Sequence, residues 1–392
     1  MSVTTTGPPT VEATKRLLTT NPGMHRLNEK VMGQVFTGLE NEVVCTFCLL
    51  QVLSLAYQLG NRTVRTEVEV GLESTQPDDL AVALLWAASA ENQTLTGTLL
   101  GYYQRDEPPT CDQPAPAVRS PARSPARSPP QDPERCRRIQ EFVADSGRPV
   151  DFKQPSTTDQ INAEVSRATG GRIEELFTPL PSDTRLVFVS ALVFADHWRS
   201  RMVTARGLFH GAKRDVQTEL LLLREDLPIL DGTADGVIGV SLPYEQPGVR
   251  MFVFTTVDGS DVRRRLSQQH YERLAAVKQL TYTRVTMPSF DIASKKRSYI
   301  DLVSEMGMGT MFAGGMGADD QLKVAKLEHK AVIKTDRDGT QAAGAAGVAV
   351  VPLSAKPQPF QARFDRPFVC SLVHTELGVP IFTAYVADPL LK

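Results

Sequence analysis

Residues 339–354 form an uncharged run of small and β-branched side chains, GTQAAGAAGVAVVPLS, and this run restricts the folds open to the chain. Surface loops normally carry more Asp, Asn, Ser and Pro. A helix is disfavoured because Gly344, Gly347 and the neighbouring valines all lower helix propensity. An exposed segment that can pair as a strand is an aggregation hazard. We therefore expect this run either to be buried in a sheet or to act through its tendency to join one.

The segments on either side of this run carry motifs that are specific in combination. Residues 327–340 read LEHKAVIKTDRDGT, and residues 364–389 read FDRPFVCSLVHTELGVPIFTAYVADP, two strand-like runs separated by a turn. The chain resembles the serpin family in three places: the hinge sequences HKAV and DRDGTQAAGA, the FDRPF motif that opens the last strand-like segment, and the FTAYVADP motif that closes it. The resemblance extends back through residues 161–200, 241–254, 281–292 and 302–312, and covers about three quarters of the chain.

This resemblance implies an α+β fold in which several helices pack on three β-sheets and a reactive-centre loop, residues 339–363, is exposed. On length alone, 392 residues allow two or three domains, but serpins fold as one, so we expect a single domain over residues 1–392. The apolar patterns predict two helices within residues 27–59, the second buried and ended by Gly60. They also predict strands within residues 185–195 and 236–257.

Residues 106–133 differ from the rest because Pro, Arg and Ser dominate them, with the repeat RSPARSPARSPP. Such a composition buries too little apolar surface to order itself, so we expect a flexible insertion. A solvated linker is the favoured interpretation. The alternative is a regulatory segment in which Ser120 and Ser124 are sites for proline-directed kinases and the arginines hold an anionic partner.

Motifs for catalysis are missing from the sequence. It has no GxSxG elbow, HExxH pair or Walker loop, and GMGTMF lacks the third glycine of a dinucleotide loop. The six histidines show no ligand spacing: His25, His197, His210, His270, His329 and His374. The net charge of -2 and short apolar stretches favour neither a nucleic-acid binder nor a membrane protein. We expect no enzymatic activity, no cofactor and no metal.

The resemblance instead implies a suicide-substrate inhibitor of serine proteases. The partner is a target protease that forms a covalent acyl complex when it cuts the loop, which then inserts as a strand into the inhibitor's own sheet. The protein is expected to be a monomer that can form loop-sheet polymers. Two alternatives remain: a non-inhibitory carrier or chaperone, and a cross-class inhibitor of a papain-like cysteine protease.

The hinge of the loop has the side chains that insertion requires. Alternate residues of a strand face the core, so Thr340, Ala342, Gly344 and Ala346 are expected to point inward after the opening Gly339. The residues expected to face outward are Gln341, Ala343 and Ala345. All four inward residues are small, and this favours an inhibitor over a carrier because a charged or bulky residue would obstruct insertion.

The spacing of the family places the reactive bond fourteen residues after Gly339, at Leu353-Ser354. Counting back from Phe364 gives Lys356 instead, but that bond precedes Pro357, where serine proteases cut poorly. Leu353, preceded by Val351 and Pro352, suits chymotrypsin-like targets of the cathepsin G and chymase types. Elastases are further candidates, and trypsin-like targets are disfavoured.

By resemblance, three other residues belong to the regions called the breach and the shutter, which control insertion. Trp198 matches a tryptophan at the top of the central sheet, and His329 matches a histidine under its midpoint. Ser190 stands where relatives carry asparagine, and Leu49 replaces a serine of their buried helix. We expect a thinner polar network here, and hence a less stable native state or easier loop insertion and polymerisation.

The sequence leaves the cellular location open between secreted and cytoplasmic. No secretory signal is recognisable at the amino terminus, and five cysteines is an odd number, which favours the interior of the cell. Cys45 and Cys48 form a lone CxxC that we place on a core helix. The sequons at Asn61 and Asn92 favour secretion.

Overall fold

The computed structural model describes residues 23–74, 95–110, 133–294, 297–317, 322–340, 358–375 and 378–391. The helices are α2 (Gly23–Val35), α3 (Thr46–Leu59), α4 (Arg62–Leu72), α6 (Pro133–Glu141), the π-helix η1 (Phe142–Ser146), α7 (Thr157–Ala168), the 3-10 helix η2 (Val262–Arg264), α8 (Gln268–Ala276), α9 (Ile300–Glu305) and α10 (Thr310–Ala313). None of these helices is long and apolar enough to cross a membrane.

Helix α3 runs through the core, and all but one of its residues are buried. Cys45 is its N-cap, and Gly60 ends it in an extended conformation whose N–H donates to Ala56 O. Apolar side chains of α3 occur on nearly all sides of the helix, so it packs against neighbouring elements on every side. The two helices expected within residues 27–59, and the end at Gly60, are confirmed.

A six-stranded antiparallel sheet forms the middle of the molecule, in the order β1-β19-β18-β10-β9-β8. Its strands are β1 (Glu42–Val44), β8 (Ile229–Asp231), β9 (Val237–Pro243), β10 (Val249–Thr256), β18 (Phe368–His374) and β19 (Val379–Val386). Every residue of β18 and β19 is buried, which accounts for their nearly unbroken apolar sequence.

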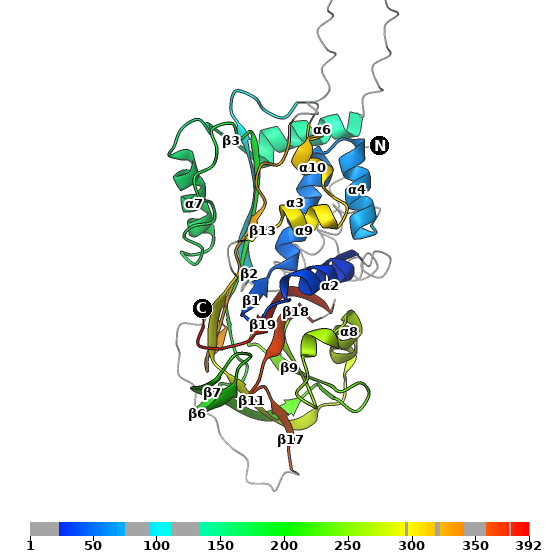
Figure 1. The fold of residues 1–392 in the computed structure, drawn as a ribbon, viewed down its shortest axis with the longest axis vertical. Helices are drawn as coiled ribbons and strands as arrows, with labels where there is room; N and C mark the ends of the chain where they lie inside the picture. Colours follow the sequence, from blue (N-terminus) through cyan, green and yellow to red (C-terminus); the bar gives the residue numbers. More distant parts are fainter. Residues whose placement is uncertain are drawn as a thin grey trace, which may run out of the picture.

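A four-stranded sheet lies at the lower end of Figure 1, in the order β17-β11-β7-β6. Its strands are β6 (Val203–His210), β7 (Asp215–Leu227), β11 (Thr281–Pro288) and β17 (Phe360–Arg363). Strand β17 pairs parallel to β11.

The long central sheet consists of three hydrogen-bonded pieces, β3-β2-β4, β12-β15-β16-β5 and β13-β14. Their strands are β2 (Leu95–Gln104), β3 (Gly147–Val150), β4 (Leu186–Phe194), β5 (Asp196–His197), β12 (Phe290–Ala293), β13 (Arg297–Ser298), β14 (Glu328–His329), β15 (Val332–Thr335) and β16 (Gly339–Thr340). A single residue separates β4 from β5, and two separate β14 from β15, so these pieces continue one another. The described residues therefore form three sheets in all, as the fold class predicts.

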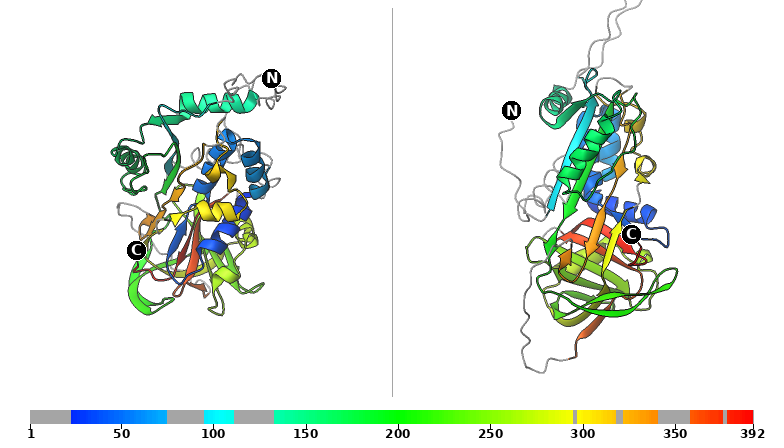
Figure 2. Two further views of the ribbon diagram at one scale, coloured as in Figure 1. Left: turned by 45° about the horizontal axis from the view of Figure 1, so that its top comes forward. Right: turned by 90° about the vertical axis from the view of Figure 1, so that its left-hand side faces the viewer.

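The helices lie on both sides of the central sheet (Figures 1 and 2). Helix α7 lies on one face, and α3, α4, α9 and α10 lie on the opposite face. Asn162 of α7 holds the following segment, because its amide donates to Phe177 O and accepts from the backbone N–H groups of Leu176 and Phe177. Residues 111–132 of the expected insertion lie outside the described residues.

Candidate functional site

The hinge residues Gly339 and Thr340 lie within the central sheet as strand β16, between two other strands. Gly339 pairs with His197 and Thr340 with Asp196, and on the other side Thr340 pairs with Thr335. Thr340 is buried. Gly339 and Thr340, the first two residues of the expected loop, are therefore bonded into the sheet.

Gly339 is required by close packing against the neighbouring strand. A Cβ at this position would lie 2.1 Å from Asp196 O and 2.7 Å from the Cα of His197. Both contacts are with backbone, which cannot rotate away as a side chain can. A larger residue would push the hinge out from between its neighbours.

A tight turn at residues 336–339 fixes the start of the hinge. Asp336 Oδ1 accepts from the N–H groups of Asp338 (2.9 Å) and Gly339 (3.2 Å). Two further hydrogen bonds tie this turn to the other side of the sheet, from Trp198 N to Asp338 O and from Met202 N to Arg337 O, both 3.0 Å. The turn therefore spans the top of the central sheet.

Trp198 lies in a cluster of aromatic and hydroxyl side chains directly beside the hinge. Its ring stacks on Tyr244 with centroids 4.6 Å apart, and its Nε1 donates to Asp336 O at 2.8 Å. The Tyr244 hydroxyl shares a 2.6 Å hydrogen bond with the hydroxyl of Thr340, which lies 3.3 Å from that of Thr335. Burial raises the pKa of Tyr244 well above its usual value. The phenol thus stays neutral and links the hinge to the tryptophan; we call Trp198, Tyr244, Thr335, Thr340 and Gly339 the breach cluster.

Asp196 is a buried carboxylate next to the hinge. Its Oδ1 accepts from His197 N at 2.8 Å and its Oδ2 from Gln246 N at 3.2 Å. Burial raises the pKa of this carboxyl, an effect that the two backbone donors and His197 oppose and the nearby Glu245 charge reinforces. Asp196 therefore links strand β5, which pairs with Thr340, to the turn that follows Tyr244.

Below the breach cluster, the central sheet has an open edge along β4. Strand β4 pairs with β2 on one side. On the other side, one backbone hydrogen bond among the described residues joins it to residues 322–331, from Ala325 N to Leu186 O at 3.0 Å. All nine residues of β4 are buried. We call the boundary between β4 and residues 322–331, where no β-ladder joins the two in the described part of the chain, the seam.

The floor of the seam is formed by α3. Ser190 of β4 donates to Gln51 Oε1 at 2.6 Å, so this hydroxyl has a buried polar partner that the sequence analysis did not identify. A cavity of about 10 Å³ adjoins Ser190 and is bounded by Cys45, Cys48, Tyr299 and Glu328, among others. His329 lies in β14, opposite Arg297, and its side chain lies outside the described part of the structure.

Cys45 and Cys48 form a disulfide at the start of α3. The sequence predicts both cysteines on a core helix, and this prediction is incomplete because Cys45 precedes the helix as its N-cap and is bonded to Cys48. Cys136 is also disulfide-bonded, and Cys370 is a buried free thiol whose pKa is raised by burial. Among the described residues no group of His, Cys, Asp and Glu is arranged to hold a metal ion.

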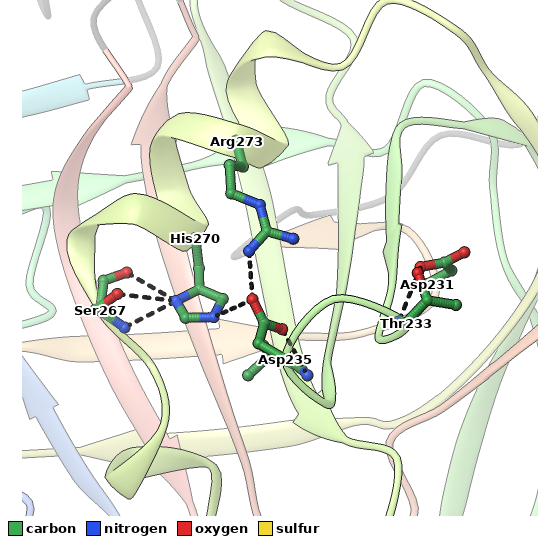
Figure 3. Close-up of polar contacts among 7 residues, drawn as sticks. Asp231, Thr233, Asp235, Ser267, His270 and Arg273 are labelled. Carbon is green, nitrogen blue, oxygen red and sulfur yellow. Dashed lines mark hydrogen bonds and ion pairs between the residues drawn. The ribbon is translucent and has the colours of Figure 1, made fainter.

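One histidine cluster resembles a hydrolytic triad but is a helix cap (Figure 3). Ser267 Oγ lies 3.0 Å from His270 Nδ1, and His270 Nε2 lies 3.3 Å from Asp235 Oδ2, which also pairs with Arg273. The backbone N–H of Ser267 donates to the same Nδ1 at 3.1 Å. Because this N–H occupies the single lone pair of Nδ1, the imidazole is not available as a base for the serine, and the cluster caps α8 instead.

A cavity of about 420 Å³ lies between α2 and the segment that contains η2 and α8. Apolar side chains of Met32, Phe36, Leu266 and Tyr271 line it together with the charged groups of Glu29, Asp261, Arg263 and Arg264. A mixed lining of this kind is typical of sites for small amphipathic molecules.

The structure thus describes some of the expected site residues and not others. Trp198, Gly339 and Thr340 lie together in the breach cluster, and Ser190 lies lower, on the seam. Gln341 to Ala346 and the reactive-bond residues Val351, Pro352, Leu353 and Ser354 lie outside the described residues. Tyr244, Asp196 and Gln51 had no local sequence signal, because each acts on a strand far away in the chain.

Comparison with known proteins gives consistent similarities. A family model described as "Serpin (serine protease inhibitor)" matches residues 34–389. The chain is 28% identical over 251 residues to Iripin-2 of Ixodes ricinus, covering 60% of this chain and 63% of that protein. It is 29% identical over 254 residues to a serine protease inhibitor of Rattus norvegicus, covering 61% of this chain and 60% of that protein. The match therefore spans about three fifths of the length of these two relatives.

Solved structures share the fold over almost the full chain. The native thermophilic serpin Tengpin superposes with a TM-score of 0.78 at 15% identity, covering 98% of this chain and 96% of that one. Native protease nexin-1 with heparin gives a TM-score of 0.74 at 18% identity, covering 97% and 100%.

Proposed function

The chain belongs to the serpin family, and on that premise we propose that it inhibits chymotrypsin-like serine proteases as a suicide substrate cut at Leu353-Ser354. The observation that carries the proposal is the open edge of β4 beneath a hinge whose first two residues are already paired in the sheet. An unpaired edge of a buried strand is a template for another strand.

Insertion can start at the breach without a separate nucleation step. Thr340 already pairs with Asp196 on one side and with Thr335 on the other. The next residues of the loop, up to Ala346, are small and uncharged, so they can follow Thr340 into the seam with little steric or desolvation cost. The β-branched residues Val348, Val350 and Val351 favour extension of the new strand.

The energy of insertion is large enough to trap an enzyme. Each new backbone hydrogen bond contributes roughly 1 kcal/mol net, so a strand of about a dozen residues supplies on the order of ten. This is comparable to the total stability of a typical domain. A protease held by an acyl bond to Leu353 would be carried with the loop and distorted before that bond is hydrolysed.

Specificity is proposed from the residues before the cut. Leu353 fits the hydrophobic primary pocket of chymotrypsin-like enzymes, and Val351 and Pro352 extend the same apolar surface. The protein would act as a monomer in a one-to-one covalent complex with the protease. Nucleic acid, membrane and cofactor have no part in this mechanism.

An SDS gel of the protein incubated with chymotrypsin or cathepsin G tests the proposal. We expect a band that corresponds to the sum of the two masses and resists boiling, because the acyl bond is covalent. The matched control is Ala342→Arg, which places a charge at an expected inward position of the loop beyond the residues already paired and should give cleavage at Leu353 without the complex. Cleavage of the wild-type chain without any complex would reject inhibition of these proteases, and a complex formed only with a papain-like enzyme would move the target to that class.

The cavity between α2 and α8 supports a second candidate, a carrier of small amphipathic molecules. Its volume of about 420 Å³ is within the range of ligand sites. An anionic amphipathic dye such as anilinonaphthalene sulfonate is a suitable probe, with Gly33→Leu as a variant that projects into the cavity. Saturable binding that this variant abolishes would favour the carrier, and equal binding by both proteins would reject it.

A further inference from the structure

We propose that the Cys45–Cys48 disulfide is a redox switch on the seam, and that its reduction makes the central sheet easier to open. The inference concerns the regulation of the insertion proposed above and rests on it. It starts from three features: the position of the bond in α3, its position beneath the seam, and the lack of space around it.

The disulfide ties the first turn of the helix that supports β4. Cys45 is the N-cap of α3, and its Sγ accepts from Cys48 N at 3.1 Å. A helix N-terminus stabilises a thiolate, as it does in CxxC redox motifs. A cysteine at this position can therefore be released as a thiolate when the disulfide is reduced, and can attack again to re-form it. The same turn is anchored to α2, where Thr46 Oγ1 donates to Asn28 Oδ1 at 2.9 Å.

The two cysteines lie at the start of α3, beneath the seam, and border the same small cavity as residues from both of its sides. The small cavity that they border is closed by Ser190 from β4 and by Leu327 and Glu328 from the strand across the seam. Both cysteines are almost fully buried, with exposed fractions of 2% and 3%. A reductant therefore reaches the bond when β4 and residues 327–328 separate, which is the motion that admits the loop.

The lack of free space around the disulfide couples its reduction to the width of the seam, and this coupling acts in both directions. A cavity of about 10 Å³ holds at most one water molecule. Two separate thiols need more room than one disulfide, because their sulfur atoms move apart to van der Waals distance, and a close-packed wall resists that change. Reduction therefore favours a wider seam, and a wider seam favours reduction.

The reaction itself is thiol–disulfide exchange with a dithiol reductant. A thiolate of the reductant attacks one sulfur and forms a mixed disulfide, releasing the other cysteine as a thiolate that takes up a proton. The second thiol of the reductant then displaces the remaining cysteine. The products are two cysteine thiols and the oxidised, cyclic reductant, with two electrons and two protons transferred.

Amide hydrogen exchange of residues 186–194 tests the switch without any protease. The intact chain is compared before and after dithiothreitol, with mass spectrometry of alkylated Cys45 and Cys48 to confirm reduction. We expect exchange along β4 to be faster by about threefold or more once the bond is reduced. Equal exchange in the oxidised and reduced proteins would overturn the inference.

Variants separate this bond from the other disulfide. Cys45→Ala/Cys48→Ala should exchange as the reduced wild-type chain does and should not respond to dithiothreitol. Cys136→Ser keeps the Cys45–Cys48 bond and should respond as the wild type does. If the double variant does not fold, Cys48→Ser replaces it, because Cys45 then remains as the helix cap. A response that persists in the variant without Cys48 would contradict the assignment.

Two separate measurements distinguish failure of the switch from failure of insertion. Insertion is read from the melting temperature of the loop-cleaved chain, which involves no reductant. The switch is read from the exchange of β4 in the uncleaved chain, whether or not the loop inserts after cleavage.

Discussion

The roles of Gly339 and Trp198 are predicted from sequence by resemblance, whereas their contacts with distant strands could not be predicted. Both stand in motifs that resemble those of a known family, so the sequence alone places them at the hinge and the breach. Tyr244 is 96 residues from Thr340, with which it shares a hydrogen bond, and nothing in its surrounding sequence marks it as a hinge contact. The missing information is the register between distant strands, which local patterns do not encode.

Asp196 has a raised pKa because it is buried, and this makes its ionised form costly at neutral pH. The folded pKa lies above the unfolded one, so the cost is absent at low pH and appears as the pH rises through the folded value. We therefore expect Asp196→Asn to gain stability relative to the wild type as the pH is raised from about 4 to about 7. Melting temperatures of both proteins across this range measure the difference.

Asp231→Asn is the matched control with the opposite sign. Hydrogen bonds from Thr233 lower the pKa of Asp231, so its contribution to stability is present at neutral pH and is lost as the pH falls through the folded value. This variant should therefore approach the wild type in stability as the pH is lowered. If the difference in stability between Asp196→Asn and the wild type stays constant with pH, burial does not penalise the ionised Asp196 carboxylate.

Helix α3 and strand β4 show that apolar sequence patterns can predict which helices and strands are buried. Their near-continuous hydrophobic sequences correctly predict a buried helix and a buried strand. The same strand sequence fits a β4 paired on both edges, so the open edge was not predictable. The expected loss of polar contacts at Ser190 is partly offset by Gln51, a buried polar residue of the mostly apolar helix α3.

Ser190→Ala is expected to destabilise the junction between α3 and β4. It leaves the buried Gln51 Oε1 without its hydroxyl donor, at a cost of about 1–3 kcal/mol. The measurements are the melting temperature and the rate of polymer formation on native gels under mild heating, and we expect the first to fall and the second to rise.

The control replaces both partners, because an apolar pair needs no hydrogen bond. Ser190→Ala/Gln51→Met should recover most of the stability that the single variant loses. If the double variant is as unstable as Ser190→Ala, the loss comes from packing around residue 190 and not from the unpaired amide.

The whole fold was predictable because several motifs, spread over most of the chain, indicate the same family. What they do not give is which strands of the central sheet are hydrogen-bonded to each other. Among the described residues, Gly339 and Thr340 are paired within the sheet, whereas β4 has a ladder partner, β2, on one edge and a single backbone hydrogen bond on the other. The insertion proposed above would add the loop at that second edge.

Cleavage at Leu353-Ser354 without a trapped enzyme should therefore stabilise the whole molecule. About a dozen new ladder residues contribute on the order of ten kcal/mol, which for a chain of this size corresponds to a rise in melting temperature of about 10 °C or more. The measurement is calorimetry of the intact and the cut chain, with Ala342→Arg, intact and cut at the same bond, as the control. The cut variant should melt near the intact protein, because a charged residue at the hinge blocks entry to the seam. A wild-type chain that melts at the same temperature before and after the cut would show that the open edge of β4 does not accept the loop.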